Sequence, residues 1–278
     1  MFEIFNILFT NPTTNLLVAF YKVFASLGVP YAFGLAIIAL TIAIRIILWP
    51  FTAVQVKSAH QMQKIAPLMK KVRERYKDDK KKQQEETMRI YREHKINPVA
   101  GCLPLLIQMP FIFGLYQVLI FAVNINDNAG LSDLNKILYA DFLKLDHLWD
   151  TSLIGLPLGA SPTNLFSTMP LIFLVPVLTG VFQFILSKMM MPAETIEIQE
   201  KFAKKTPEKT DDFQAAFQKQ SLFIFPAMIG FFSFTLPVGL SLYWNTFTIF
   251  GILQQYILLG PGALAPLLKR VNLHGEKK

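Results

Sequence analysis

One charged residue lies inside a long apolar stretch of this sequence, and it has the clearest potential for chemistry. Arg45 falls within residues 31–52, which contain no Asp, Glu, Lys or His. An arginine cannot deprotonate in a protein, and a charge placed mid-membrane costs about 2.5 to 3.5 kcal/mol. None of the long apolar stretches offers a carboxylate as its partner. The residue therefore indicates either snorkelling to lipid headgroups or hydration from a water-filled cavity.

Polar residues at helical spacing favour the cavity. The repeating sets are Thr41 with Arg45, Thr179 with Gln183 and Ser187, and Ser241 with Asn245 and Thr248, supplemented by Gln117. Residues at this spacing share one helix face. Hydrogen bonds between helices would explain any single set, but several sets around one cation predict a hydrophilic groove open to the cytoplasm. The residues expected to line the groove are Arg45, Thr41, Gln108, Gln183, Tyr243 and Trp244.

The composition is typical of a membrane protein. Of the 278 residues, 53% are hydrophobic and only 17% are charged, and the mean hydropathy is +0.39. Apolar stretches of about 20 residues, the length that crosses a bilayer, recur along the chain. The single cysteine, Cys102, excludes a disulfide framework. The four histidines are too scattered for a metal cluster, so we expect no metal or other cofactor.

Five stretches reach the length of a transmembrane helix, which predicts an all-α polytopic membrane protein. The predicted order is a first core span at 31–52, a cytoplasmic helical hairpin at 53–97, a second span at 98–123, an extracytoplasmic loop at 124–166, a third span at 167–187, a cytoplasmic loop at 188–219, a fourth and a fifth span within 220–259 (220–236 and 238–259), and a short basic tail at 260–278. Residues 1–30 are predicted to form an amphipathic segment at the outer interface, because the apolar run 16–29 is short and contains Lys22. A sixth span is the open alternative.

The distribution of lysine and arginine predicts the orientation. Residues 57–95 carry 13 of them, the loop 188–219 carries 6 and the tail carries 4, whereas residues 1–30 and 124–166 together carry only Lys22, Lys136 and Lys144. Cytoplasmic loops are enriched in these residues. The amino terminus is therefore predicted to lie outside and the carboxyl terminus in the cytoplasm.

The basic segment 53–97 has the pattern of two amphipathic helices. Met62, Ile65 and Met69 recur at intervals of three and four in the first half, as do Met88 and Tyr91 in the second. The sequence KDDKKK between them predicts a polar turn. The charge suits either a solvated face near anionic headgroups or a surface that docks a partner. The residues assigned to docking are Lys77, Lys80, Lys81 and Lys82.

Three motifs resemble those of one known family. RIILWPFTAVQ at 45–55, INPVAGCLPLLIQMPFIFGLY at 96–116 and LPVGLSLYWNTFTIFGILQQY at 236–256 are similar, in order and spacing, to the YidC-type membrane protein insertases of bacteria and organelles. The resemblance implies a five-helix core, a cytoplasmic hairpin and a hydrophilic groove whose arginine matches Arg45. Trp244 matches the groove aromatic that meets substrate, and Gln183 a groove-facing polar residue. Phe247 stands where the family pattern has an asparagine.

The resemblance implies a protein that inserts integral membrane proteins and helps them to fold, and that is not an enzyme. The implied partners are nascent membrane proteins and the lipid bilayer, with a Sec-type translocon, the ribosome and the signal recognition machinery as further candidates, and no nucleic-acid specificity. The implied location is a bacterial cell membrane, and the short tail suggests a minimal bacterial form. The alternative from another class is an anion channel or transporter that uses Arg45. An intramembrane enzyme would need a carboxylate pair, a histidine or a metal set, which the predicted spans lack.

Overall fold

The computed structural model describes residues 2–94, 96, 103–125, 127–190 and 212–265. These residues are overwhelmingly helical, with one pair of two-residue strands, which confirms the all-α class. Contacts divide the chain into two units. The first comprises 1–48, 105–182 and 227–250, and the second comprises 49–104, 183–226 and 251–278. Each unit is described separately.

The first unit contains the amino-terminal helices, the segment after α7 and parts of three long helices. Its elements are α1 (Phe2–Phe5), the π-helix η1 (Asn6–Thr10), α2 (Asn11–Ser26), α3 (Ala32–Ile47), most of α7 (Leu103–Asn124), α8 (Asn128–Ile137), η3 (Asp141–Leu143), β1 (Ser152–Leu153), β2 (Leu156–Pro157), α9 (Pro162–Leu165), η4 (Pro170–Phe173) and parts of α10 (Leu174–Met190), α12 (Asp212–Thr235) and α13 (Val238–Leu259).

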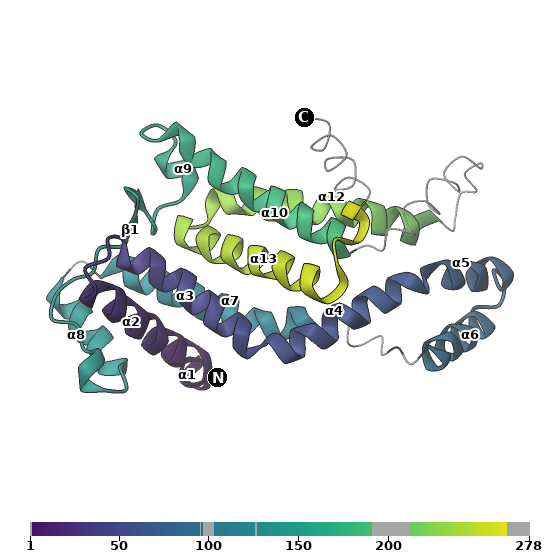
Figure 1. The fold of residues 1–278 in the computed structure, drawn as a ribbon, viewed down its shortest axis with the longest axis horizontal. Coiled ribbons are helices and arrows are strands. Elements are labelled where there is room, and N and C mark those ends of the chain that lie inside the picture. The colour runs from purple at the N-terminus through teal and green to yellow at the C-terminus, as the bar shows by residue number, and fades with distance from the viewer. Residues whose placement is uncertain (1, 95, 97–102, 126, 191–211, 266–278) are drawn as a thin grey trace, which may run out of the picture. The chain divides into compact units, whose positions relative to one another are not determined.

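The core of the first unit forms where α2, α3 and α7 meet, with α2 and α3 side by side (Figure 1). α3 and α7 are apolar on nearly all sides, so each buries one face here and leaves apolar side chains such as Ile46 and Phe113 exposed on another. The fully buried side chains include Leu17 and Val18 of α2, Phe33 and Ile37 of α3, and Leu119 of α7. This packing holds α3, the helix that carries Arg45.

The helical run from Phe2 to Ser26 contacts α7 as well as α3. The ring centroids of Phe9 and Phe111 lie 5.8 Å apart, and Thr10 Oγ1 donates a hydrogen bond of 3.1 Å to Gln117 Oε1. The segment predicted at 1–30 is therefore a packed part of this unit. Its interfacial position in the membrane stays a prediction.

The segment predicted as a loop at 124–166 is an ordered cover of the first unit. Asp127 caps α8 by accepting a hydrogen bond from Gly130 N at 2.8 Å. Leu134 of α8 and Leu158 are fully buried, and the indole N–H of Trp149 donates to Ala122 O at 3.0 Å. That carbonyl is in the last turn of α7, where no intrahelical donor is available.

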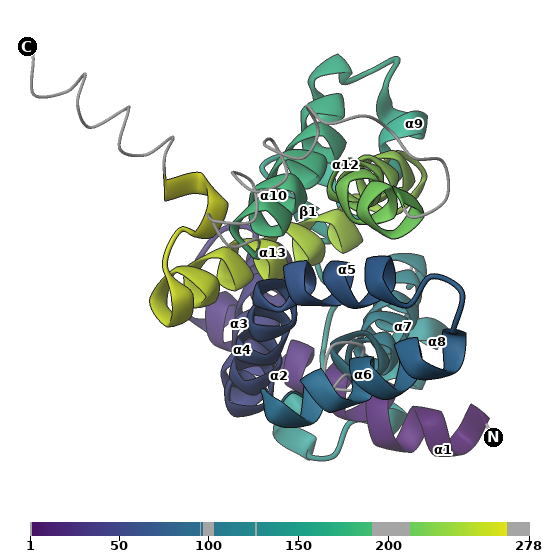
Figure 2. The same ribbon diagram turned by 90° about the vertical axis from the view of Figure 1, so that its right-hand side faces the viewer.

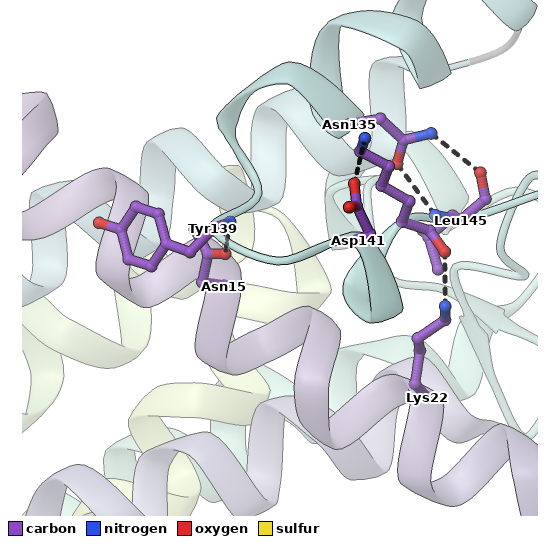
Figure 3. Close-up of polar contacts among 7 residues, drawn as sticks. Asn15, Lys22, Asn135, Tyr139, Asp141 and Leu145 are labelled. Atoms are coloured by element: carbon purple, nitrogen blue, oxygen red, sulfur yellow. Dashed lines mark hydrogen bonds and ion pairs between the residues drawn. The ribbon is translucent and has the colours of Figure 1, made fainter.

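Polar side chains of α2 bind the backbone of this cover. Asn15 accepts a hydrogen bond from Tyr139 N at 2.6 Å (Figure 3). Asn15 also donates to Ile137 O at 3.0 Å, and Lys22 Nζ donates to Phe142 O at 2.7 Å. Within the cover, Asn135 exchanges two hydrogen bonds of 2.9 Å with the backbone of Leu145. Backbone groups in irregular segments lack the hydrogen-bond partners that helices and sheets provide, and these side chains supply them.

The cover also contains an exposed ion pair. Lys144 Nζ lies 2.6 Å from Asp141 Oδ1. The hydrogen bond and the positive charge lower the pKa of the Asp141 carboxyl. Because both side chains are well exposed, the pair contributes little to folding.

The second unit contains α4 (Trp49–Lys64), α5 (Ala66–Arg75), α6 (Lys80–Glu93), η5 (Gly262–Leu264) and the remaining parts of α10, α12 and α13. The predicted hairpin is present: α5 and α6 run side by side in opposite directions (Figures 1 and 2). Ile65, Met69 and Ile96 form its buried cluster, with Met62 and Tyr91 packed against it. Met62, Ile65, Met69 and Tyr91 were predicted from the sequence, whereas the prediction was wrong for Met88, which is 41% exposed while Ile90 packs against the cluster. The helix breaks at Ile65, two residues before Pro67.

The turn of the hairpin is shorter than predicted. Lys80, Lys81 and Lys82 form the first turn of α6 instead of a polar loop. Asp79 is the reason, since its carboxylate accepts from Lys82 N at 3.0 Å and caps the helix.

The number of transmembrane spans stays a prediction. Among the described residues, Pro170–Met190 is long and apolar enough to cross a membrane, and Ala32–Ile47 with Trp49–Lys64 qualify only as one broken span. Met109–Ala122 and Leu222–Thr235 are apolar but shorter. α12 begins at Asp212, ahead of the predicted start at 220. Residues 191–211 of the predicted loop and 266–278 of the predicted tail lie outside the described part.

Candidate functional site

Arg45 lies in the last turn of α3 and is buried, with 6% of its surface exposed. Its guanidinium donates to the backbone carbonyl of Phe247 on α13, through Nη2 at 2.6 Å and Nε at 3.3 Å. Its carbon Cζ lies 3.7 Å from the centroid of the Phe247 ring and 5.5 Å from that of Phe250. Both partners belong to the same unit as Arg45.

The expectation of an unpaired cation was therefore wrong. The predicted spans contain no carboxylate that could pair with Arg45, whereas the structure provides a main-chain carbonyl and an aromatic face. Both can stabilise a guanidinium where water is scarce. With so little exposed surface, the side chain is also not one that extends freely to headgroups. A hydrated groove around it stays a prediction.

Tyr243 supports this arrangement from one turn earlier on α13. It is 2% exposed, and its ring centroid lies 6.0 Å from that of Phe247. Residues four apart share a helix face, so Tyr243 and Phe247 form one aromatic stripe toward Arg45. Trp244 follows Tyr243 in the chain and is only partly buried.

The other predicted groove residues are placed differently. Thr41 is 1% exposed and its hydroxyl donates to Ile37 O at 2.7 Å, so it bonds within its own helix. Gln183 lies on the part of α10 that belongs to the second unit. Gln108 is on α7, but its side chain lies outside the described part. Of the six predicted residues, the structure thus brings Arg45 and Tyr243 together through Phe247, which the sequence analysis did not select.

A buried hydroxyl cluster joins α10, α12 and α13 within the first unit. Ser233 Oγ lies 2.7 Å from Ser241 Oγ and 3.5 Å from Thr179 Oγ1, and all three residues are at most 4% exposed. The polar sets predicted around Thr179 and Ser241 therefore include ordinary hydrogen bonds between helices. Ser233 was missed, although it is a lone serine in an apolar run. One turn after Ser241, Asn245 Oδ1 is buried and has no hydrogen-bond partner among the residues that the structure describes.

Two buried glutamines in the second unit were also missed. Gln254 Nε2 donates to Thr52 Oγ1 at 2.8 Å, and Gln255 Nε2 donates to Met189 O at 3.2 Å. Both glutamines are 1% exposed. Their position in the motif GILQQY was available as a signal, because adjacent amides in an apolar helix need buried partners.

The lysines assigned to docking are exposed at the end of the hairpin. Lys77, Lys80, Lys81 and Lys82 all face solvent. Lys82 Nζ lies 3.9 Å from Asp79 Oδ2, a weak exposed pair. The end of the hairpin therefore presents a basic surface.

Comparison with known proteins identifies the family of this chain. The sequence profile of the family described as "60Kd inner membrane protein" matches residues 23–261. The chain belongs to this family. It is 31% identical to the membrane protein insertase YidC of Fusobacterium nucleatum over 83% of this chain and 88% of that protein. It is 32% identical to the YidC insertase of Streptomyces avermitilis over 95% of this chain and 62% of that protein.

The fold agrees with a solved member of the family. A crystal structure of an active YidC insertase with its first transmembrane domain resolved superposes with a TM-score of 0.54 at 25% identity, over 88% of this chain and 45% of that chain. A further relative, the YidC insertase of Nitratidesulfovibrio vulgaris, is 32% identical over 90% of this chain and 38% of that protein. The chain thus spans from about two fifths to nine tenths of the length of these relatives. Membership confirms a helical membrane protein of the YidC type.

Proposed function

We propose that this chain is a membrane protein insertase and chaperone, which inserts hydrophobic segments and helps them to fold. The observation that carries the proposal is Arg45, a permanent cation kept in an apolar helix packing at the position of the family's arginine. The relatives named as insertases support the same activity. The process makes and breaks no covalent bond, so the proposal includes no catalytic residue.

Arg45 would act on the polar flank of an incoming segment. Moving charged residues through hydrocarbon is costly, and a hydrated groove with a cation within it lowers that cost. A substrate carboxylate binds a guanidinium more strongly than a neutral carbonyl does. An acidic flank would therefore bind the guanidinium in preference to a neutral backbone group.

The apolar part of α12 would shorten the path. Leu222–Thr235 spans about 21 Å at 1.5 Å per residue, against about 30 Å of hydrocarbon. A short apolar helix thins the bilayer beside it. The hydrophobic segment would leave sideways into this thinned lipid.

The proposed setting is a bacterial cell membrane crossed five times, with the amino terminus outside and the carboxyl terminus in the cytoplasm. The substrates would be nascent membrane proteins. The exposed lysines at the end of the hairpin support docking of a partner such as the ribosome, the signal recognition machinery or a Sec-type translocon. Gln183 and Trp244 are proposed as further groove residues on the strength of the family pattern, and Gln108 as a polar residue of the second predicted span.

The test compares substrates with acidic and neutral flanks in proteoliposomes that contain equal amounts of folded protein. Arg45→Lys keeps the charge and should retain most insertion, whereas Arg45→Ala should impair acidic flanks selectively. Arg92→Ala is the matched control, because it removes an exposed arginine from the hairpin. Equal insertion of both substrates by Arg45→Ala would remove the charge from the mechanism. Anion flux through substrate-free vesicles that depends on Arg45 would indicate the channel alternative instead.

A further inference from the structure

Phe247 contacts Arg45 with two different groups. Its carbonyl accepts from the guanidinium edge at 2.6 and 3.3 Å, and its ring lies 3.7 Å from the guanidinium carbon. Every residue of a helix offers a carbonyl, so that contact is independent of the side chain at 247. The ring contact depends on an aromatic side chain at this position.

The two contacts together restrict the orientation of the guanidinium. A ring that stacks on its face leaves its N–H donors pointing outward in one plane. The carbonyl then selects which edge of that plane faces α13. With one face and one edge assigned, the directions of all five donors are set.

The ring is itself held in place. Tyr243, one turn away on α13, is buried and its ring centroid lies 6.0 Å from that of Phe247. Phe250 adds a second aromatic ring 5.5 Å from the guanidinium carbon. The guanidinium therefore packs against an aromatic surface that is built into α13.

We propose that Phe247 is a positioning residue, which presents the edge of the Arg45 guanidinium to a carboxylate of the substrate flank. A guanidinium binds a carboxylate through two parallel hydrogen bonds only when the two groups are coplanar. Phe247 thus determines specificity for acidic flanks, while Arg45 supplies the charge. This role rests on the proposed function, in which Arg45 receives the flank.

The stack is measured first, without substrate. In protein labelled with ¹⁵N-arginine in nanodiscs, the Nε–H proton of Arg45 should show an upfield ring-current shift, assigned by its loss in Arg45→Lys. Phe247→Leu should abolish the shift, whereas Phe247→Trp should keep it. Phe231→Leu is the control, because Phe231 is an aromatic residue that is 67% exposed on α12. An unshifted proton in the unsubstituted protein would overturn the inference and leave the proposed function intact.

Insertion is measured next, as the ratio of acidic-flank to neutral-flank substrate. Phe247→Leu should lower this ratio about thirtyfold, the size of one desolvated cation–π contact, and Phe247→Trp should restore it. If the ratio is unchanged in Phe247→Leu but lowered in Arg45→Ala, the positioning role of Phe247 is refuted and the proposed function is not. A ratio unchanged in both would refute the use of Arg45 in the proposed function, and the positioning role with it. If Phe247→Leu does not accumulate, a ratio in Phe247→Trp well below that of the unsubstituted protein overturns the inference.

Discussion

Replacing Asn15 by alanine should release the cover formed by α8 and the segment that follows it. Asn15 is 6% exposed and its side chain makes three hydrogen bonds, of which two reach the cover. One joins it to Tyr139 N at 2.6 Å (Figure 3) and the other to Ile137 O at 3.0 Å. The third, to Asn11 O at 2.9 Å, stays within the amino-terminal helices. Asn15→Ala therefore leaves the carbonyl of Ile137 and the amide of Tyr139, both in a partly buried site, without this partner.

The magnitude follows from these two groups. Leaving a buried polar group unsatisfied costs about 1 to 3 kcal/mol. Both groups are only partly buried, and water can reach them once the amide is deleted, so we expect about 1 to 3 kcal/mol in total. At about 1.4 kcal/mol per factor of ten, local opening should become roughly 5 to 140 times more frequent.

Amide hydrogen exchange in nanodiscs measures this opening directly. Peptides that contain Tyr139 and Leu145 should exchange faster in Asn15→Ala by the stated factor, while the hairpin should exchange as before. Asn128→Ala is the control, because Asn128 is exposed at the start of α8. If the Tyr139 amide exchanges at the same rate in Asn15→Ala and in Asn128→Ala, the hydrogen bonds of Asn15 do not hold the cover.

Three further predictions concern other parts of the chain. Gly230→Ala should destabilise the protein by about 1 to 3 kcal/mol in thermal unfolding, because its Cβ would lie 3.3 Å from a backbone atom of α10, whereas Gly114→Ala, with 3.6 Å to its nearest neighbour, should have little effect. Met69→Ala should weaken the hairpin by about 2 to 3 kcal/mol and speed its proteolysis, unlike Met88→Ala at a position that is 41% exposed. A cysteine at Asp141 should react with an impermeant reagent from outside intact cells, and one at position 80 only after permeabilisation; the reverse would contradict the predicted orientation.

The hairpin shows what local sequence determines. Met62, Ile65 and Met69 are close in the chain, so their spacing alone indicates the buried face, and the structure confirms it. The exact turn was mispredicted because Asp79 caps α6 and draws the lysines into its first turn. A capping carboxylate beside three lysines has the composition of a loop, so composition concealed the helix start.

The cover after α7 shows what patterning concealed. Its apolar residues are spread between aspartates and short turns, so the sequence indicated a loop without a core. Leu134 and Trp149 are nevertheless buried, because α2, α3 and α7 provide an apolar surface for them. Burial of scattered residues depends on surfaces from elsewhere in the chain, which no periodicity within 124–166 reveals.

Arg45 separates the two contributions most clearly. The sequence by itself determined that a permanent charge lies in an apolar helix, that the cost of placing it there must be offset, and that the predicted spans contain no carboxylate to do so. Only the tertiary structure decided the partner, which is a carbonyl and a ring 202 residues away. The physical reason is that every helix residue carries a carbonyl and that 13% of the chain is aromatic. Such groups become specific only when packing brings one of them against the guanidinium.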